Sequence, residues 1–148
     1  MLFRSDLDTA TALVTARHLA GSESLSSAVV ADASQSWTRR GRQWLVELHQ
    51  RVRERHEEHG EVAFMLEPNL KEGLGGLRDI HTLGWAVRAG LALSPADIAE
   101  LERCNDVLLT VRVALHRQAA RAAETLRLED QRSEEHTSEL QSPCNLVC

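Results

Sequence analysis

Apolar residues recur every three or four positions through most of the first 60 residues, which is the spacing of helices that bury one side. A first helix is expected between a cap at Asp8 or Thr9 and a stop at Gly21. The pattern then predicts a shorter helix over residues 22–30 and a longer one over residues 36–60. The apolar positions of the longer helix are Trp37, Trp44, Leu45, Leu48 and Val52.

The second half of the chain continues the helical pattern after one short interruption. Residues 62–66 form an apolar run that is too brief to classify by period, so a strand and an extended connector are both open. Helical spacing returns after Gly76 and lasts to about Gly90. The stretch 94–97, Ser-Pro-Ala-Asp, predicts the capped start of a last long helix that reaches about Leu126. Because no strand alternation occurs elsewhere, we expect an all-α fold.

One segment concentrates glycines and charges instead of alternating helically. Three of the chain's eight glycines lie within residues 71–77, where they permit positive φ and the close approach of a backbone or a ligand. The segment leads into a helix N-terminus, whose free N–H groups can hold an anion. The alternative is a packing device in which Arg78 and Asp79 form local ion pairs only.

The order of residues in this segment is similar to a known motif. The segment reads Glu67-Pro68-Asn69-Leu70-Lys71-Glu72-Gly73-Leu74-Gly75-Gly76-Leu77-Arg78-Asp79. It resembles E-P-N-x-K-E-G-x-G-G-L-R-D of the bifunctional bacterial enzymes that uridylylate and deuridylylate the PII nitrogen-signalling protein, which is followed by a helix with a Trp, here Trp85. Residues 75–80 alone are similar to the glutamine-synthetase adenylyltransferases. Leu74 stands where many members have proline, so the turn should be less rigid here.

The resemblance covers most of residues 6–131, including a helix at 11–21 and an arginine-bearing helix at 111–116. It implies a helical domain that follows a nucleotidyltransferase core, in an enzyme that uses Mg²⁺ and UTP or ATP to modify PII. It also implies candidate site residues. The candidate phosphate or substrate contacts are Lys71 and Arg78, the candidate orienting carboxylate is Asp79, and the loop-forming residues are Glu67, Asn69, Gly73, Gly75 and Gly76.

Both ends of the chain look foreign to that domain. Residues 132–142 lack apolar periodicity and are similar to the translation of a DNA-sequencing adapter, and residues 2–5 resemble the matching adapter. We therefore expect a non-native leader at 1–5, an incomplete helical domain at 6–131, and an adapter-derived or disordered tail at 132–148.

The net charge, the cysteines and the lengths of the apolar runs exclude several classes of protein. A net charge of −5 does not suggest nucleic acid as a partner. Cys144 and Cys148 lie in the expected tail and Cys104 on a helical pattern, so no disulfide framework or zinc spacing remains. No apolar run approaches the roughly 20 residues that span a bilayer, and no secretory leader is recognisable. We expect a cytoplasmic protein without a membrane partner.

Two patterns imitate metal sites. Ser5-Asp6-Leu7-Asp8 has the form of the S-D-x-D signature with which nucleotidyltransferases hold two metal ions, but that signature belongs on a strand and the residues that follow here are helical. His49, His56 and His59 have helical spacing but lie among Arg and Glu residues, which is typical of a solvated helix face. Neither pattern predicts a metal site, and the three tryptophans are expected in the core.

The resemblance implies a larger protein than this chain. The metal motif of the core, the His-Asp ligands of the uridylyl-removing hydrolase and the glutamine-sensing domains of the family are not recognisable here. We therefore expect this fragment alone to be inactive. The competing hypothesis is a non-catalytic helical module whose glycine loop docks a partner protein.

Overall fold

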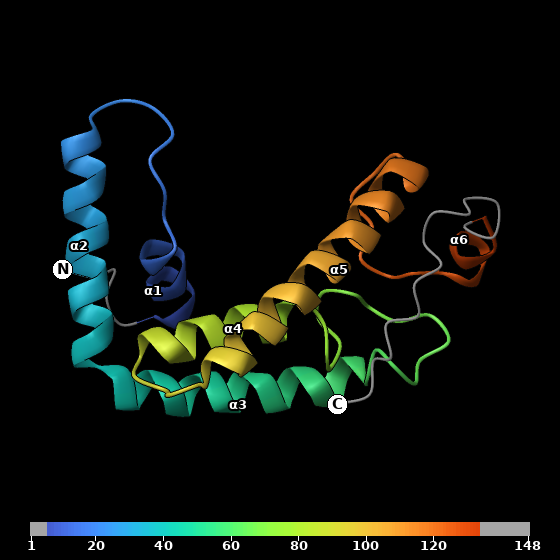
Figure 1. The fold of residues 1–148 in the computed structure, drawn as a ribbon, viewed down its shortest axis with the longest axis horizontal. Helices are drawn as coiled ribbons and strands as arrows, with labels where there is room; N and C mark the ends of the chain where they lie inside the picture. Colours follow the sequence, from blue (N-terminus) through green and yellow to red (C-terminus); the bar gives the residue numbers. More distant parts are fainter. Residues whose placement is uncertain (1–5, 134–148) are drawn as a thin grey trace. The chain divides into compact units, whose positions relative to one another are not determined.

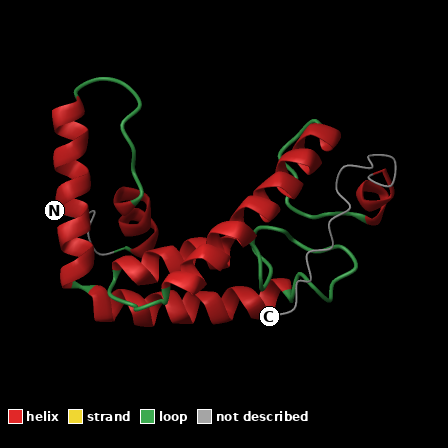
Figure 2. Ribbon diagram, viewed as in Figure 1, coloured by secondary structure: helices red, strands yellow, loops and turns green. Residues whose placement is uncertain are grey.

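The computed structural model describes residues 6–133, which form helices joined by turns and loops (Figure 2). The helices of this part of the chain, labelled in Figure 1, are α1 (Leu7–Val14), α2 (Glu23–Arg39), α3 (Gly41–His59), α4 (Leu77–Arg88), α5 (Pro95–Ala119) and α6 (Leu128–Ser133). Within residues 6–133, β pairing is limited to two isolated bridges, Glu61 with Leu74 and Asn69 with Thr125. The all-α prediction is confirmed, and the run at 62–66 forms no strand.

The expected leader at 1–5 and most of the expected tail, residues 134–148, lie outside the described residues. Helix α6 includes residues 132 and 133. None of the helices in the described part of the chain combines the length and the apolar character needed to cross a membrane.

The chain divides into two compact units. The first contains the residues up to Val52 and His81–Leu93, and the second contains Arg53–Ile80 and the residues from Ser94 onward. Helices α3 and α4 contribute residues to both units. Each unit has its own hydrophobic core.

The core of the first unit is built on two tryptophans. Trp37 and Trp44 are 2% and 1% exposed, and their rings stack with centroids 5.1 Å apart. The indole Nε1 of Trp37 donates to the carbonyl of Trp85 at 3.1 Å. The other buried members of this core are Leu7, Val14, Leu48, Ala86 and Ala89. The prediction that the tryptophans belong to the core is confirmed for Trp37 and Trp44, and Trp85 packs against the same cluster.

Helix α1 lies beside α2 and is shorter than its apolar pattern predicts (Figure 1). Asp6 caps it, accepting from the backbone N–H of Thr9 at 3.0 Å. The helix ends at Val14 and does not reach Gly21, so the predicted end is wrong. The hydroxyls of Thr11 and Thr15 donate to carbonyls four residues back, at 3.0 and 2.7 Å, and this alternative hydrogen bonding weakens the helix interior.

The next two helices differ from the prediction in where the chain breaks. Helix α2 continues over residues 31–35, which contain two alanines and no glycine or proline to stop it. The break comes instead at Arg40, so the predicted helix over residues 36–60 is two helices. A Cβ on Gly41 would overlap the carbonyl oxygen of Ala89 and lie 3.2 Å from its carbonyl carbon. Glycine is therefore required at position 41, where the start of α3 contacts the residue that follows α4.

We expect Gly41→Ala to destabilise the chain by about 2 kcal/mol, since the added methyl must displace backbone rather than a flexible side chain. Gly84 is the matched control, because nothing lies within 4 Å of a Cβ built there. Gly84→Ala in helix α4 should be neutral or stabilising by about 0.5–1 kcal/mol, since alanine favours the helix. Urea denaturation followed by circular dichroism measures both, and equal midpoints for the two variants would contradict the close approach at Gly41.

The core of the second unit lies under the glycine loop. Its buried members are Leu70, Leu115 and Ala123, and the half-buried residues packed against them are Val62, Val111, Ala119 and Leu126. Helix α5 begins with the predicted capping box, in which Ser94 and Asp97 bond each other's backbone N–H groups.

Helix α5 stops before its predicted end near Leu126. The helix ends at Ala119, and Ala120 has the left-handed φ of 51°. The following residues bind the glycine segment instead of extending the helix. Leu70 N–H donates to the carbonyl of Glu124 at 2.8 Å, and Leu126 N–H donates to that of Pro68 at 2.9 Å. These contacts join residues that are far apart in sequence, which explains why the local hydrophobic pattern predicted the wrong end for α5.

Candidate functional site

Asn69 shapes the first half of the glycine loop. Its side-chain Oδ1 accepts from the backbone N–H groups of Lys71 at 3.0 Å and Glu72 at 2.8 Å. Its own carbonyl accepts from Gly73 N–H at 3.1 Å. An asparagine that bonds the backbone two and three residues ahead closes a tight turn. Asn69 therefore closes the turn that begins the glycine loop.

Two of the loop glycines are required by close contacts, and a third by its backbone angle. A Cβ on Gly73 would lie 2.8 Å from a methyl of Val62, and one on Gly76 would lie 2.8–3.0 Å from three loop carbonyl oxygens. Gly75 has a φ of +83°, a region that side chains disfavour. The loop is thus packed tightly against its own backbone.

The N-terminus of helix α4 uses its donors within the loop. Leu77 N–H donates to Leu70 at 3.0 Å, Arg78 N–H to Lys71 at 2.9 Å, and Asp79 N–H to Gly76 at 3.0 Å. These three N–H groups have carbonyl partners and are not available to an anion. The expectation that the helix N-terminus itself holds an anion is therefore wrong, and any anion would have to be bound by side chains.

Two basic side chains of the loop converge on one carboxylate oxygen. Lys71 Nζ lies 3.4 Å and Arg78 Nη2 lies 3.1 Å from Oε1 of Glu72. Both basic side chains are 35% exposed, and that of Glu72 is 23% exposed. Burial alone would raise the pKa of Glu72, but the hydrogen bonds and charges of Arg78 and Lys71 hold it below its usual value. Glu72 therefore holds the two basic side chains side by side at the loop.

Asp79 faces a different set of partners. Its carboxylate accepts from the guanidinium of Arg55, from Nε2 of His56 at 2.9 and 3.1 Å, and from the N–H of Gly75 at 2.8 Å. The side chains of Arg55 and Asp79 are 11% and 18% exposed. Asp79 therefore ties the glycine loop to the C-terminal end of helix α3.

The histidines of helix α3 do not behave alike. His49 is exposed, as expected for a solvated helix face, but His56 is half-buried against Asp79, so the expectation is wrong for His56. His59 lies 4.0 Å from Glu58. Within residues 6–133, no three His, Cys, Asp or Glu side chains are grouped so that they could hold a metal ion. Asp6 and Asp8 lie at the start of a helix, where Asp6 is a cap and Asp8 pairs with Arg51 at 3.3 Å.

A second ion pair supports the loop from helix α5. Arg112 Nε donates to Oε2 of Glu124 at 2.7 Å, and this hydrogen bond lowers the pKa of Glu124 and raises that of Arg112. Because the carbonyl of Glu124 also accepts from Leu70, the pair connects α5 to the loop. Sequence reasoning did not assign Arg55, His56 or Glu124, because each is separated from its partner by 12 or more residues.

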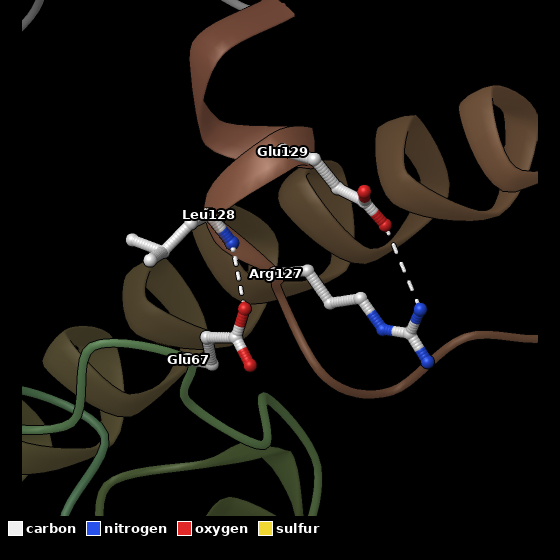
Figure 3. Close-up of a pocket in the computed structure, with 4 residues that line it drawn as sticks. All are labelled: Glu67, Arg127, Leu128 and Glu129. Atoms are coloured by element: carbon white, nitrogen blue, oxygen red, sulfur yellow. Dashed lines mark hydrogen bonds and ion pairs between the residues drawn. The ribbon is translucent and has the colours of Figure 1, made fainter.

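Glu67 lies at the other end of the loop, beside an open pocket of about 560 Å³ (Figure 3). Its Oε1 accepts from the N–H of Leu128 at 3.1 Å. Arg127 and Glu129 line the same pocket and pair with each other at 3.5 Å. Glu67 therefore joins the loop to the start of α6. The structure thus brings Lys71 and Arg78 together, and it places Asp79 and Glu67 in separate anchoring contacts.

The glycine loop lies within the part of the chain that is similar to known proteins. The family model described as GlnD PII-uridylyltransferase matches residues 44–137. A bifunctional uridylyltransferase/uridylyl-removing enzyme from Streptomyces coelicolor is 42% identical over 131 residues, which are 85% of this chain and 15% of that protein. Proteins of the same name from Rhodopseudomonas palustris and Vibrio campbellii are 34% and 37% identical, over 87% and 76% of this chain.

The chain spans about 15% of the length of the curated relatives that it matches. No solved structure matches the chain.

Proposed function

This chain belongs to the PII-uridylyltransferase family, and we propose that it is part of a longer cytoplasmic protein that transfers a uridylyl group from UTP to the PII signal protein. The alternative within this proposal is transfer of an adenylyl group from ATP. In the full-length parent, the helical domain follows a nucleotidyltransferase core and completes the site around the nucleotide. The relatives are uridylyltransferase/uridylyl-removing enzymes, which supports this reaction class.

The convergence of Lys71 and Arg78 on Glu72 carries the proposal for this chain. Transfer of a nucleotidyl group develops negative charge on phosphate oxygens, which positioned cations stabilise. Lys71 and Arg78 are held together at a rigid loop and keep about a third of their side-chain surface exposed. We assign them to contacts with the triphosphate or with the protein substrate.

Asp79 has an indirect role in this proposal. Its carboxylate is occupied by Arg55, His56 and Gly75, so it orients the loop that presents the two cations. Mg²⁺ belongs to the reaction of the parent, but the described residues of this chain do not group ligands that fit it. We therefore assign the metal to the core and no residue of this chain to it.

The second candidate function is a non-catalytic interaction module. The internal hydrogen bonds of the α4 N-terminus favour it, because they give the glycines a packing role without any ligand. In this reading, Lys71, Arg78 and Glu72 hold the loop that docks a partner protein.

Labelled nucleotide distinguishes the two functions. We expect the full-length parent with Mg²⁺ to transfer label from UTP to PII, and the 148-residue chain alone to transfer none, because it supplies no grouped metal ligands in its described part. Label from ATP would identify the adenylyl variant. Absence of label from either nucleotide with the intact parent would contradict the proposal and leave the interaction module. Label transferred by the chain alone, and lost in Asp6→Asn or Asp8→Asn, would contradict our assignment of the metal to the core.

A further inference from the structure

The turn that precedes the glycine loop exposes three consecutive large apolar side chains. Phe64, Met65 and Leu66 are 82%, 50% and 78% exposed. Single exposed apolar residues are common on protein surfaces, but three in succession on one turn favour an interaction site. We call this group the apolar turn.

The backbone under the apolar turn is firmly held. The N–H groups of Phe64 and Met65 donate to the carbonyl of Glu61 at 3.1 and 3.2 Å. Val62 N–H donates to Leu74 at 3.0 Å, and its side chain packs on the core of the second unit. Gln131 also donates to the carbonyl of Leu66 at 2.7 Å. The apolar side chains are therefore presented by an ordered turn, which lowers the entropic cost of binding.

The surface next to the apolar turn is open and carries acidic groups. Glu67, which follows Leu66 directly, lines the open pocket with Glu129, whose side chain is 75% exposed (Figure 3). Arg127 is the basic residue of that lining and is paired with Glu129. Figure 3 shows the side chain of Leu128 extending away from that ion pair. An apolar centre with a charged edge is the usual anatomy of a protein interface.

We propose that the apolar turn docks on another segment of the full-length parent, one that presents an apolar surface with lysine or arginine at its edge. The chain spans about 15% of the relatives' length, so most of the parent polypeptide is available as the partner. A second copy is disfavoured, because a symmetric contact through this surface would bring the acidic groups of both copies together. The proposal rests on family membership and does not require nucleotide transfer by the parent.

Thiol labelling of the full-length parent tests this docking. Phe64→Cys and Leu66→Cys are made singly, so that the neighbouring apolar residues remain, and the labelled site is located by mass spectrometry of peptides. Glu57→Cys, at a side chain that is 75% exposed on helix α3, is the control. We expect Cys at 64 and 66 to react with maleimide on the order of tenfold more slowly than Cys at 57, because a closed interface excludes the reagent. Rates in urea correct for intrinsic reactivity.

The other outcomes each contradict the proposal. Equal rates at the three positions would show that the apolar turn is open in the parent. Protection that is lost on dilution would identify a second copy as the occupant, and protection that requires added PII would identify PII. Because labelling is independent of nucleotide transfer, failure of this proposal is distinguishable from failure of the proposed function.

Discussion

We expect Arg78→Lys in the full-length parent to lower kcat for modification of PII by on the order of 10²-fold while the melting temperature changes little. Arg78 shares Oε1 of Glu72 with Lys71, so its guanidinium is directed by a carboxylate and a rigid loop. Lysine keeps the charge and can keep an ion pair with Glu72, but it cannot present the planar pair of donors that binds a phosphate in two places. A transition-state contact should therefore be lost while the fold is kept.

Arg103→Lys is the control for this measurement, because Arg103 is 68% exposed and pairs with Glu100 on the same helix. It should change neither kcat nor the melting temperature. A purely structural role for Arg78 gives the opposite pattern, in which the melting temperature falls and the folded fraction keeps near-normal turnover. An unchanged kcat in Arg78→Lys would reject a nucleotide contact.

The parts of the fold that local chemistry determines were predictable from the sequence. Helix α4 follows the glycine loop as expected, and the Ser-Pro-Ala-Asp start of α5 forms its capping box. Both signals act over three or four residues, so they can be read without knowledge of the rest of the chain. The turn-forming role of Asn69 depends on the same short range.

Some of the predictions that failed concern contacts between distant residues. The hydrophobic pattern of α5 would continue to Leu126, but Glu124 and Leu126 bond the segment at 68–70 instead. The break at Arg40 lies next to Gly41, whose backbone closely approaches Ala89, 48 residues later in the chain. Helical periodicity indicates which side of a helix is buried. It does not indicate where the helix ends because its backbone groups bond another segment instead.

The candidate site shows the same division. Lys71, Arg78 and the glycines could be identified because they lie in one short segment with an unusual composition. The partners of Asp79 could not, because Arg55 and His56 lie on a helix that is densely charged and that resembles a solvated surface. Only the fold selects these two residues from the seven Arg, Glu and His side chains between residues 51 and 58.

These partners make Asp79 the position where we expect the largest loss of stability. Asp79→Ala should destabilise this chain by about 3 kcal/mol, because it leaves the 11%-exposed guanidinium of Arg55 without its counter-charge and Gly75 N–H without its acceptor. Urea denaturation followed by circular dichroism gives the change. Asp106→Ala, at an exposed carboxylate of helix α5, is the control and should stay within about 0.5 kcal/mol of the original chain.

The double variant Arg55→Met/Asp79→Ala separates the charge contribution from the packing contribution. Removing one partner of a largely buried ion pair costs more stability than removing both, because the remaining buried charge has neither its counter-charge nor water around it. We therefore expect the double variant to recover about 1 kcal/mol or more relative to Asp79→Ala alone. If the double variant is as unstable as the sum of the single variants, the main role of Asp79 is to hold Gly75 and His56 rather than to neutralise Arg55. In that case the loop is held by hydrogen bonds, and Asp79→Asn, which keeps a carbonyl acceptor for Gly75 N–H, should retain most of the stability.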